Sequence, residues 1–212
     1  MSETAFNGTK EVFRKNAANI VTISGIIGAV WLLIVAITYP EELWLIMILS
    51  VFIGLTDFID GRIARSLKIE SSLGSALDRI RDKLFIPPVL VFLVWHYWPT
   101  KDHSVVLATL TAALVVCSVA IEIVLFAGWV FGLLTKKSVQ SNRHGRIKMF
   151  LQFIIVMVWF TSLLIEKHTG FQAVEPSLFF VDGLLTVTLY FAAKSVAGYY
   201  NRYFPQKEQK AQ

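Results

Sequence analysis

The chain has 212 residues, of which 55% are hydrophobic and 17% are charged, and its formal net charge is +5. Soluble domains carry about 25% charged residues, so the composition excludes an ordinary soluble domain and indicates an integral membrane protein. The basic residues stand in short segments between apolar stretches, which argues against nucleic acid as a partner and for anionic lipid headgroups.

The alternation of polar and apolar segments predicts an all-α integral membrane protein with six transmembrane helices and both termini in the cytosol. Residues 1–18 are polar and predict an amphipathic cytosolic helix beside the membrane. Residues 19–204 form the expected membrane domain, and residues 205–212 form an expected disordered tail. The six expected spans are, in chain order, 20–38, 43–63, 84–98, 105–134, 148–165 and 178–200.

The placement of lysine and arginine decides the expected orientation, because cytosolic loops of membrane proteins are enriched in basic residues. With both ends inside, 18 of the 20 basic residues lie on the cytosolic side, and Lys101 and Lys167 lie outside. The expected location is the bacterial cytoplasmic membrane.

Four aspartates lie at the cytosolic end of the second span and just before the third, where residues 74–83 are expected to continue as helix into that span. Asp57 and Asp60 are spaced i, i+3, and Asp78 and Asp82 are spaced i, i+4, so each pair shares one helix face. Four converging carboxylates repel one another unless a cation lies among them. Their hard oxygen atoms suit Mg²⁺, Mn²⁺ or Ca²⁺.

Small residues accompany the aspartates on the same faces. Gly61 and Ala64 follow the first pair and Gly74 precedes the second, which lets the helices approach and leaves room for a phosphate. Arg65 is suited to bind that phosphate with forked hydrogen bonds. The pattern favours phosphoryl or pyrophosphate chemistry in which one carboxylate takes a proton from an attacking hydroxyl. The structural alternative is a surface lattice of ion pairs between the aspartates and Arg62, Arg65, Arg79 and Arg81.

The fourth and fifth spans carry further candidates. Cys117 is the only cysteine, so it forms no intrachain disulfide, and we expect it to serve in packing. Glu122 stands at membrane depth, where a carboxylate is either functional or paired with a polar group from another span. Arg143, Arg146 and Lys148 form a cation cluster that either binds the phosphate of an acceptor or anchors the cytosolic face.

The string D-x-x-D-G-x-x-A-R-x8-G-x-x-x-D-x-x-x-D over residues 57–82 resembles the signature of the CDP-alcohol phosphotransferase family, and the six expected spans resemble that family too. The resemblance implies a homodimeric membrane enzyme that joins a CDP-activated group to an alcohol and releases CMP, with two divalent cations, Mg²⁺ or Mn²⁺, per active site. It implies that Asp82 is the general base and a metal ligand, beside the metal ligands Asp57, Asp60 and Asp78. It implies that CDP is surrounded by Asp57, Asp60, Gly61, Ala64, Arg65, Gly74 and Asp78.

The signature does not specify the acceptor alcohol. Residues 145–152 and 195–204 are similar to segments of bacterial phosphatidyltransferases and phosphatidylglycerophosphate synthases, which favours CDP-diacylglycerol as donor and sn-glycerol 3-phosphate as acceptor. Inositol phosphate, inositol, serine and phosphatidylglycerol stay open as acceptors. Three residues depart from the relatives: Ala18 replaces a proline before the first span, and Ile121 and Trp129 stand where those synthases carry arginines. The last two departures weaken the case for a phosphate-bearing acceptor.

A divalent-cation transporter is the alternative from another class. Such a protein requires acidic residues near the bilayer midplane on several spans. The aspartate block lies at one cytosolic rim, and we expect only Glu122 to lie deep, which disfavours transport.

Overall fold

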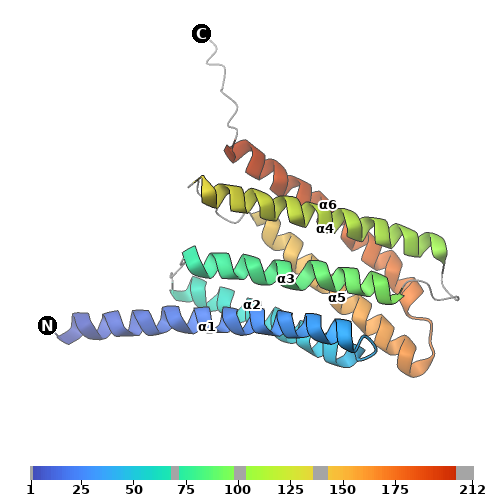
Figure 1. Ribbon diagram of the computed structural model, residues 1–212, viewed down its shortest axis with the longest axis horizontal. Helices are drawn as coiled ribbons and strands as arrows, with labels where there is room; N and C mark the ends of the chain where they lie inside the picture. The colour runs from blue at the N-terminus through green and yellow to red at the C-terminus, as the bar shows by residue number, and fades with distance from the viewer. Residues whose placement is uncertain (1, 68–71, 98–103, 136–142, 204–212) are drawn as a thin grey trace, which may run out of the picture. The chain divides into compact units, whose positions relative to one another are not determined.

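The computed structural model describes residues 2–67, 72–97, 104–135 and 143–203, and these residues form six helices and no strand (Figure 1). The all-α fold class is therefore confirmed for this part of the chain. The helices are α1 (Ser2–Thr38), α2 (Leu43–Leu67), α3 (Ser72–Tyr97), α4 (Val105–Leu134), α5 (Arg143–Thr169) and α6 (Val174–Tyr203).

Within the described residues, four helices are long and apolar enough to cross a membrane, in agreement with four of the six expected spans. Their apolar stretches are Ile20–Thr38, Val105–Leu134, His144–Thr169 and Val174–Gly198. The apolar part of α2 is shorter, Leu43–Ile59. The protein is thus a multi-pass membrane protein, while the crossings of α2 and α3 and the cytosolic placement of both termini stay predictions.

The expected amphipathic segment 1–18 and the first span form one continuous helix, α1. Ala18 explains why the helix runs on, because alanine has the highest helix propensity and a proline there would break the turn before it. Residues 74–83 likewise continue as helix into the third apolar segment, as predicted. The expected tail, 205–212, lies outside the described residues.

The chain divides into two compact units, Met1–Val89 and Leu90–Gln212. The division falls within α3, between Val89 and Leu90, one residue beyond Pro88. Each of these prolines lacks the N–H that a helix interior uses for its backbone hydrogen bonds.

The first unit is built on α1 and α2, which pack along one another. Leu32 of α1 and Ile46 and Ile53 of α2 are fully buried in this contact. Gly28 permits the close approach, because a Cβ atom there would lie 3.2 Å from the ring of Phe52. The outward faces stay apolar, as expected for helices that contact lipid, and their exposed residues include Ile27, Ile34, Ile37 and Ile48.

In the second unit, α6 packs against both α4 and α5. The core of this unit holds large side chains that are fully buried, among them Trp159, Phe160, Leu178 and Leu185. A hydroxyl pair adds a polar contact between α5 and α6, where Ser177 donates to Ser162 at 2.9 Å.

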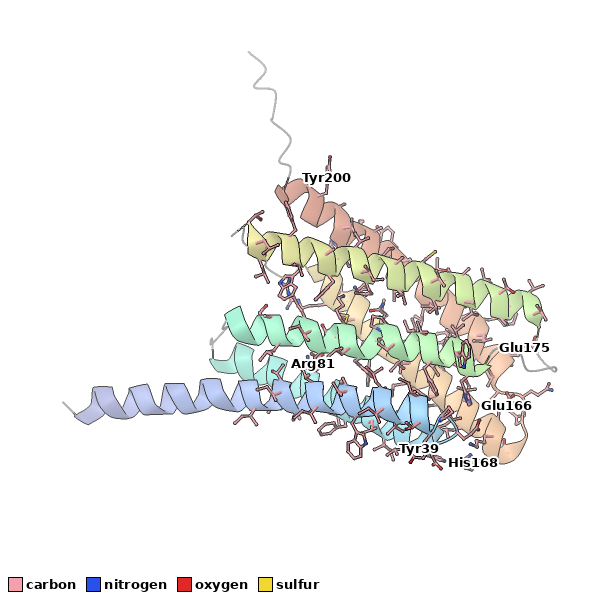
Figure 2. The ribbon with its side chains drawn as sticks, viewed as in Figure 1. Tyr39, Arg81, Glu166, His168, Glu175 and Tyr200 are labelled. Carbon is pink, nitrogen blue, oxygen red and sulfur yellow. The ribbon has the colours of Figure 1, made fainter. Side chains whose placement is uncertain are left out.

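A tight connection joins α5 to α6, and Glu166, His168 and Glu175 lie at this end of the helices, whereas Tyr200 lies near the far end of α6 (Figure 2). Gly170 adopts φ = 69°, a left-handed conformation that favours glycine. The Glu166 carboxylate accepts a hydrogen bond from the Val174 backbone N–H at 3.0 Å and so caps the start of α6.

Candidate metal centre and active site

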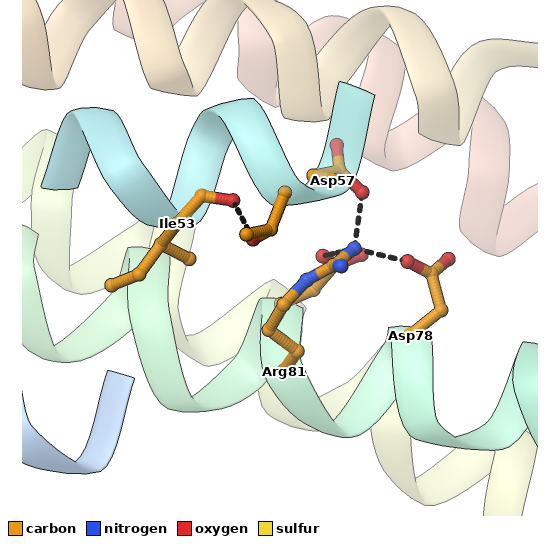
Figure 3. Close-up of polar contacts among 6 residues, drawn as sticks. Ile53, Asp57, Asp78 and Arg81 are labelled. Atoms are coloured by element: carbon orange, nitrogen blue, oxygen red, sulfur yellow. Dashed lines mark hydrogen bonds and ion pairs between the residues drawn. The ribbon is translucent and has the colours of Figure 1, made fainter. Parts of the chain in front are cut away.

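Helices α2 and α3 bring three of the four predicted aspartates together. Asp57 comes from α2, and Asp78 and Asp82 come from successive turns of α3, so that one carboxylate oxygen of each lies within 4.8 Å of the others (Figure 3). The predicted convergence is therefore confirmed for these three residues, and the shared face of Asp78 and Asp82 is confirmed with it. Carboxylates this close repel one another, which a positive charge among them or protonation of one of them relieves. Three hard oxygen ligands suit a divalent cation such as Mg²⁺ or Mn²⁺.

Arg81 supplies such a charge from within the protein. Its Nη2 atom donates to Oδ1 of both Asp57 and Asp78 and lies 3.7 Å from Oδ1 of Asp82 (Figure 3). The Arg81 side chain is 1% exposed, whereas those of Asp57 and Asp78 are 53% and 45% exposed. The arginine thus reaches the carboxylates from the buried side, and their outer side stays open to solvent. The ion pairs of Arg81 with Asp57 and Asp78 are among those that the structural alternative expected, but the arginine is buried, whereas that alternative expected a lattice on the surface.

Two small features of α1 and α2 make room for the Arg81 side chain. A Cβ atom at Gly25 would lie 2.7 Å from Cδ of Arg81 and 2.7 Å from the hydroxyl oxygen of Thr56. The Thr56 hydroxyl is itself held back on its helix, because it donates to the Ile53 carbonyl at 2.7 Å (Figure 3). The sequence analysis missed Gly25 and Thr56, since neither belongs to a recognisable motif.

Asp82 differs electrostatically from a solvent-exposed aspartate. Burial, followed by the nearby charges of Asp78 and Asp57, raises its pKa well above the ordinary value of 3.8, and the charges of Arg81 and Lys83 oppose this rise. A raised pKa makes a carboxylate a better proton acceptor. Among the three converging aspartates, Asp82 is the least exposed, and its role as general base stays a prediction.

The other residues of the signature lie on the same two helices. Gly61 on α2 and Gly74 on α3 are partly buried. Asp60, Ala64 and Arg65 belong to α2, but their side chains lie outside the described part of the structure. Their proposed contacts with metal and CDP therefore stay predictions.

The three cations predicted for acceptor binding stand in the first turns of α5 but differ in their surroundings. Arg146 is exposed, whereas Lys148 is buried and forms an ion pair with Glu122 of α4. The side chain of Arg143 lies outside the described part. Lys148 and Arg146 thus present their charges to different environments.

Glu122 is buried, as predicted, and its partner comes from another helix. Its Oε1 atom accepts hydrogen bonds from Lys148 Nζ and, at 3.2 Å, from Gln152 Nε2. Gln152 Nε2 also lies 3.2 Å from the hydroxyl of Ser118. These four residues form a polar network between α4 and α5 in which the two charges compensate each other. Trp129 is buried in the same helix, α4.

One expectation about the membrane interior was wrong, because Glu122 is not the only deep acidic residue. Asp182 of α6 is 7% exposed within a candidate span. Neither of its carboxylate oxygens has a hydrogen-bond partner among the described residues. The Thr111 hydroxyl lies beside it but donates to the Leu107 carbonyl at 3.0 Å. Asp182 could have been found from the sequence in the same way as Glu122, because both are acidic residues within apolar segments.

Comparison with known proteins agrees with this site. The sequence model of the CDP-alcohol phosphatidyltransferase family matches residues 15–192. Similar proteins include three named CDP-diacylglycerol–glycerol-3-phosphate 3-phosphatidyltransferase. The protein from Bacillus subtilis (strain 168) is 29% identical over 155 residues, or 73% of this chain and 71% of the relative. That from Shigella flexneri serotype 5b is 28% identical over 137 residues, or 63% and 68%.

The third relative, numbered 2 in its name, comes from Arabidopsis thaliana and is 33% identical over 138 residues, which cover 60% of this chain and 55% of the relative. The family match includes the whole aspartate signature and most of the helical region. The family match therefore supports a transferase and disfavours the alternative of a divalent-cation transporter. The chain belongs to the CDP-alcohol phosphatidyltransferase family.

Proposed function

We propose that this protein transfers the phosphatidyl group of CDP-diacylglycerol to the hydroxyl of sn-glycerol 3-phosphate and releases CMP. The observation that carries the proposal is the convergence of Asp57, Asp78 and Asp82 within the segment that matches the family. The names of the similar proteins from Bacillus subtilis and Shigella flexneri support this donor and this acceptor.

Divalent metal, Mg²⁺ or Mn²⁺, fits the donor set of the site. The three converging carboxylates offer hard oxygen atoms at mutual distances within 4.8 Å. We propose that Asp57, Asp78 and Asp82, together with Asp60, hold two such ions. When bound, the metal neutralises the diphosphate of the donor and stabilises the leaving phosphate.

The protein's own residues then position the donor and move one proton. Arg65 binds a donor phosphate, and Gly61, Ala64 and Gly74 leave space for the CDP group beside the backbone. Asp82 takes the proton of the acceptor hydroxyl, whose oxygen forms a new bond to the β-phosphorus of the donor. The bond between that phosphorus and the bridging oxygen breaks, and CMP departs with the bridging oxygen and the electron pair.

The acceptor carries a phosphate, so its site requires positive charge. We propose that Arg143, Arg146 and Lys148 bind this phosphate. The exposure of Arg146 supports its part in the proposal. Lys148 is buried and its charge is compensated by Glu122, so its part in the proposal rests on the resemblance of residues 145–152 to bacterial phosphatidyltransferases.

The distribution of charge and the bacterial relatives support a proposal for the placement of the enzyme in the cell. We propose that the aspartate site faces the cytosol, where CDP-linked lipids meet soluble acceptors, and that the protein lies in a bacterial cytoplasmic membrane. The excess of basic residues in the segments assigned to the cytosol supports this orientation. We further propose a homodimer, as the family resemblance implies.

Purified protein supplied with CDP-diacylglycerol, Mg²⁺ or Mn²⁺ and single acceptors tests the proposal. We expect CMP release with sn-glycerol 3-phosphate and none with inositol, inositol phosphate, serine or phosphatidylglycerol. Asp82→Asn should lower turnover at least about 1,000-fold, because the general base is lost, while thermal unfolding stays within a few degrees of the unaltered protein.

Two results would contradict the proposal. CMP release with another acceptor alone would keep the reaction class and replace the acceptor. Release that persists unchanged in Asp82→Asn would remove Asp82 from its role as base.

A further inference from the structure

The guanidinium group of Arg81 lies in the place where the aspartate cluster would hold a cation. Its Nη2 atom bonds to Oδ1 of Asp57 and Asp78 and lies 3.7 Å from Oδ1 of Asp82. The three residues that converge within 4.8 Å are the same three that surround this nitrogen. A cation bound by these oxygens and the guanidinium nitrogen therefore require the same space.

The fold holds Arg81 in this position. The side chain is 1% exposed, and an arginine buried without partners would be unfavourable by several kcal/mol. The absence of a side chain at Gly25 provides the space through which Cδ of Arg81 passes, beside Thr56. The position is thus shaped by α1 and α2 as well as by the aspartates.

We propose that Arg81 is the built-in counter-cation of the aspartate cluster, and that a divalent metal must displace its guanidinium group to bind. This inference rests on the proposed metal site. Arg81 stabilises the carboxylates while no metal is bound, because it compensates their mutual repulsion. The same contacts weaken metal binding, since they have to be broken first. Arg81 thereby sets the metal affinity of the enzyme.

Equilibrium binding of Mn²⁺ to the purified protein in detergent, read by electron paramagnetic resonance, tests the proposal without using activity. Arg81→Met removes the competing charge and keeps a side chain of similar length, so we expect the Kd for Mn²⁺ to fall at least about tenfold. Arg81→Lys keeps the charge, and its Kd should stay within about threefold of the unaltered value. A Kd for Arg81→Met that is unchanged or higher would overturn the proposal.

A control substitution distinguishes two effects on the Kd for Mn²⁺: release of the site from the Arg81 guanidinium group, and a general change in the charge of the protein. Lys83 acts on Asp82 through its charge, so Lys83→Met lowers the net charge of the protein by the same amount as Arg81→Met. We expect its Kd to change by no more than about twofold. An equal effect of both substitutions would overturn the displacement mechanism.

Two further variants keep the test decisive. Gly25→Ala leaves the arginine charge in place but crowds its Cδ atom, so it should also lower the Kd for Mn²⁺, and it serves if Arg81→Met does not fold. Asp78→Asn should abolish Mn²⁺ binding.

If the unaltered protein and every variant bind no Mn²⁺, the proposed metal site fails together with this inference. If Asp78→Asn loses binding but neither Arg81→Met nor Gly25→Ala gains affinity, only this inference fails.

Discussion

At the scale of single residues, Gly25 makes a specific prediction about stability. Gly25→Ala should lower the free energy of unfolding by about 1–3 kcal/mol, because the new methyl group overlaps both Cδ of Arg81 and the hydroxyl of Thr56. Thermal or denaturant unfolding in detergent, followed by circular dichroism, measures the change.

Gly183 provides the matched control for this substitution. It lies in another helix, α6, and a Cβ atom there would meet nothing within 4 Å. Gly183→Ala should therefore leave stability unchanged or raise it by up to about 1 kcal/mol through better helix propensity. Equal effects at Gly25 and Gly183 would show that space beside Arg81 is not what glycine provides.

The sequence sufficed to predict which aspartates converge and did not suffice to predict what lies among them. The spacing of Asp78 and Asp82 specifies one helix face by geometry alone. Arg81 stands between them in the sequence, where the pattern does not distinguish it from the other basic residues of the segment assigned to the cytosol. Its burial depends on Gly25, which is 56 positions away in the chain, so local spacing carries no signal for it.

At the scale of helices, the ion pair between Glu122 of α4 and Lys148 of α5 predicts a strong mutual dependence. Glu122→Gln leaves a buried lysine without a counter-charge, and Lys148→Met leaves a buried carboxylate. Each single substitution should lower the free energy of unfolding by about 3–5 kcal/mol. Denaturant unfolding of the purified proteins in detergent measures both.

The double variant Glu122→Gln/Lys148→Met is the informative comparison, because it removes both charges together. It should be more stable than either single variant, with a coupling energy of at least about 1 kcal/mol. Lys167→Met removes an exposed lysine from the same helix, α5, and should change stability by less than about 0.5 kcal/mol. Strictly additive single effects would contradict a direct pairing.

Helix limits were predictable where composition changes sharply and less so elsewhere. The predicted span 105–134 coincides with α4, because a continuous apolar segment stands between polar ones. The fifth span was predicted to begin at residue 148, but α5 begins at Arg143. Its first turns are polar, so hydropathy alone could not assign them to the helix. The burial of Lys148 depends on Glu122, a residue of a different helix.

At the scale of the whole molecule, the positions of the basic residues predict one orientation across the membrane. The family match covers residues 15–192, which include the four helices α2 to α5 whole and the greater part of α1 and α6. Neither composition nor helix packing predicts the orientation, because neither distinguishes the two sides of a membrane. It depends on the distribution of lysine and arginine between the loops.

Labelling of single cysteines tests this orientation. In a Cys117→Ser background, which removes the only native cysteine, Gln172→Cys places a thiol in the exposed connection between α5 and α6, and Thr135→Cys places one at the exposed end of α4. A membrane-impermeant maleimide should label position 172 in intact cells, or in spheroplasts where an outer membrane is present. Position 135 should react only after the cytoplasmic membrane is permeabilised, because the predicted orientation places it in the cytosol. The Cys117→Ser protein without an added cysteine should stay unlabelled, and the reverse pattern at 172 and 135 would place the basic loops, and the proposed active site with them, outside the cell.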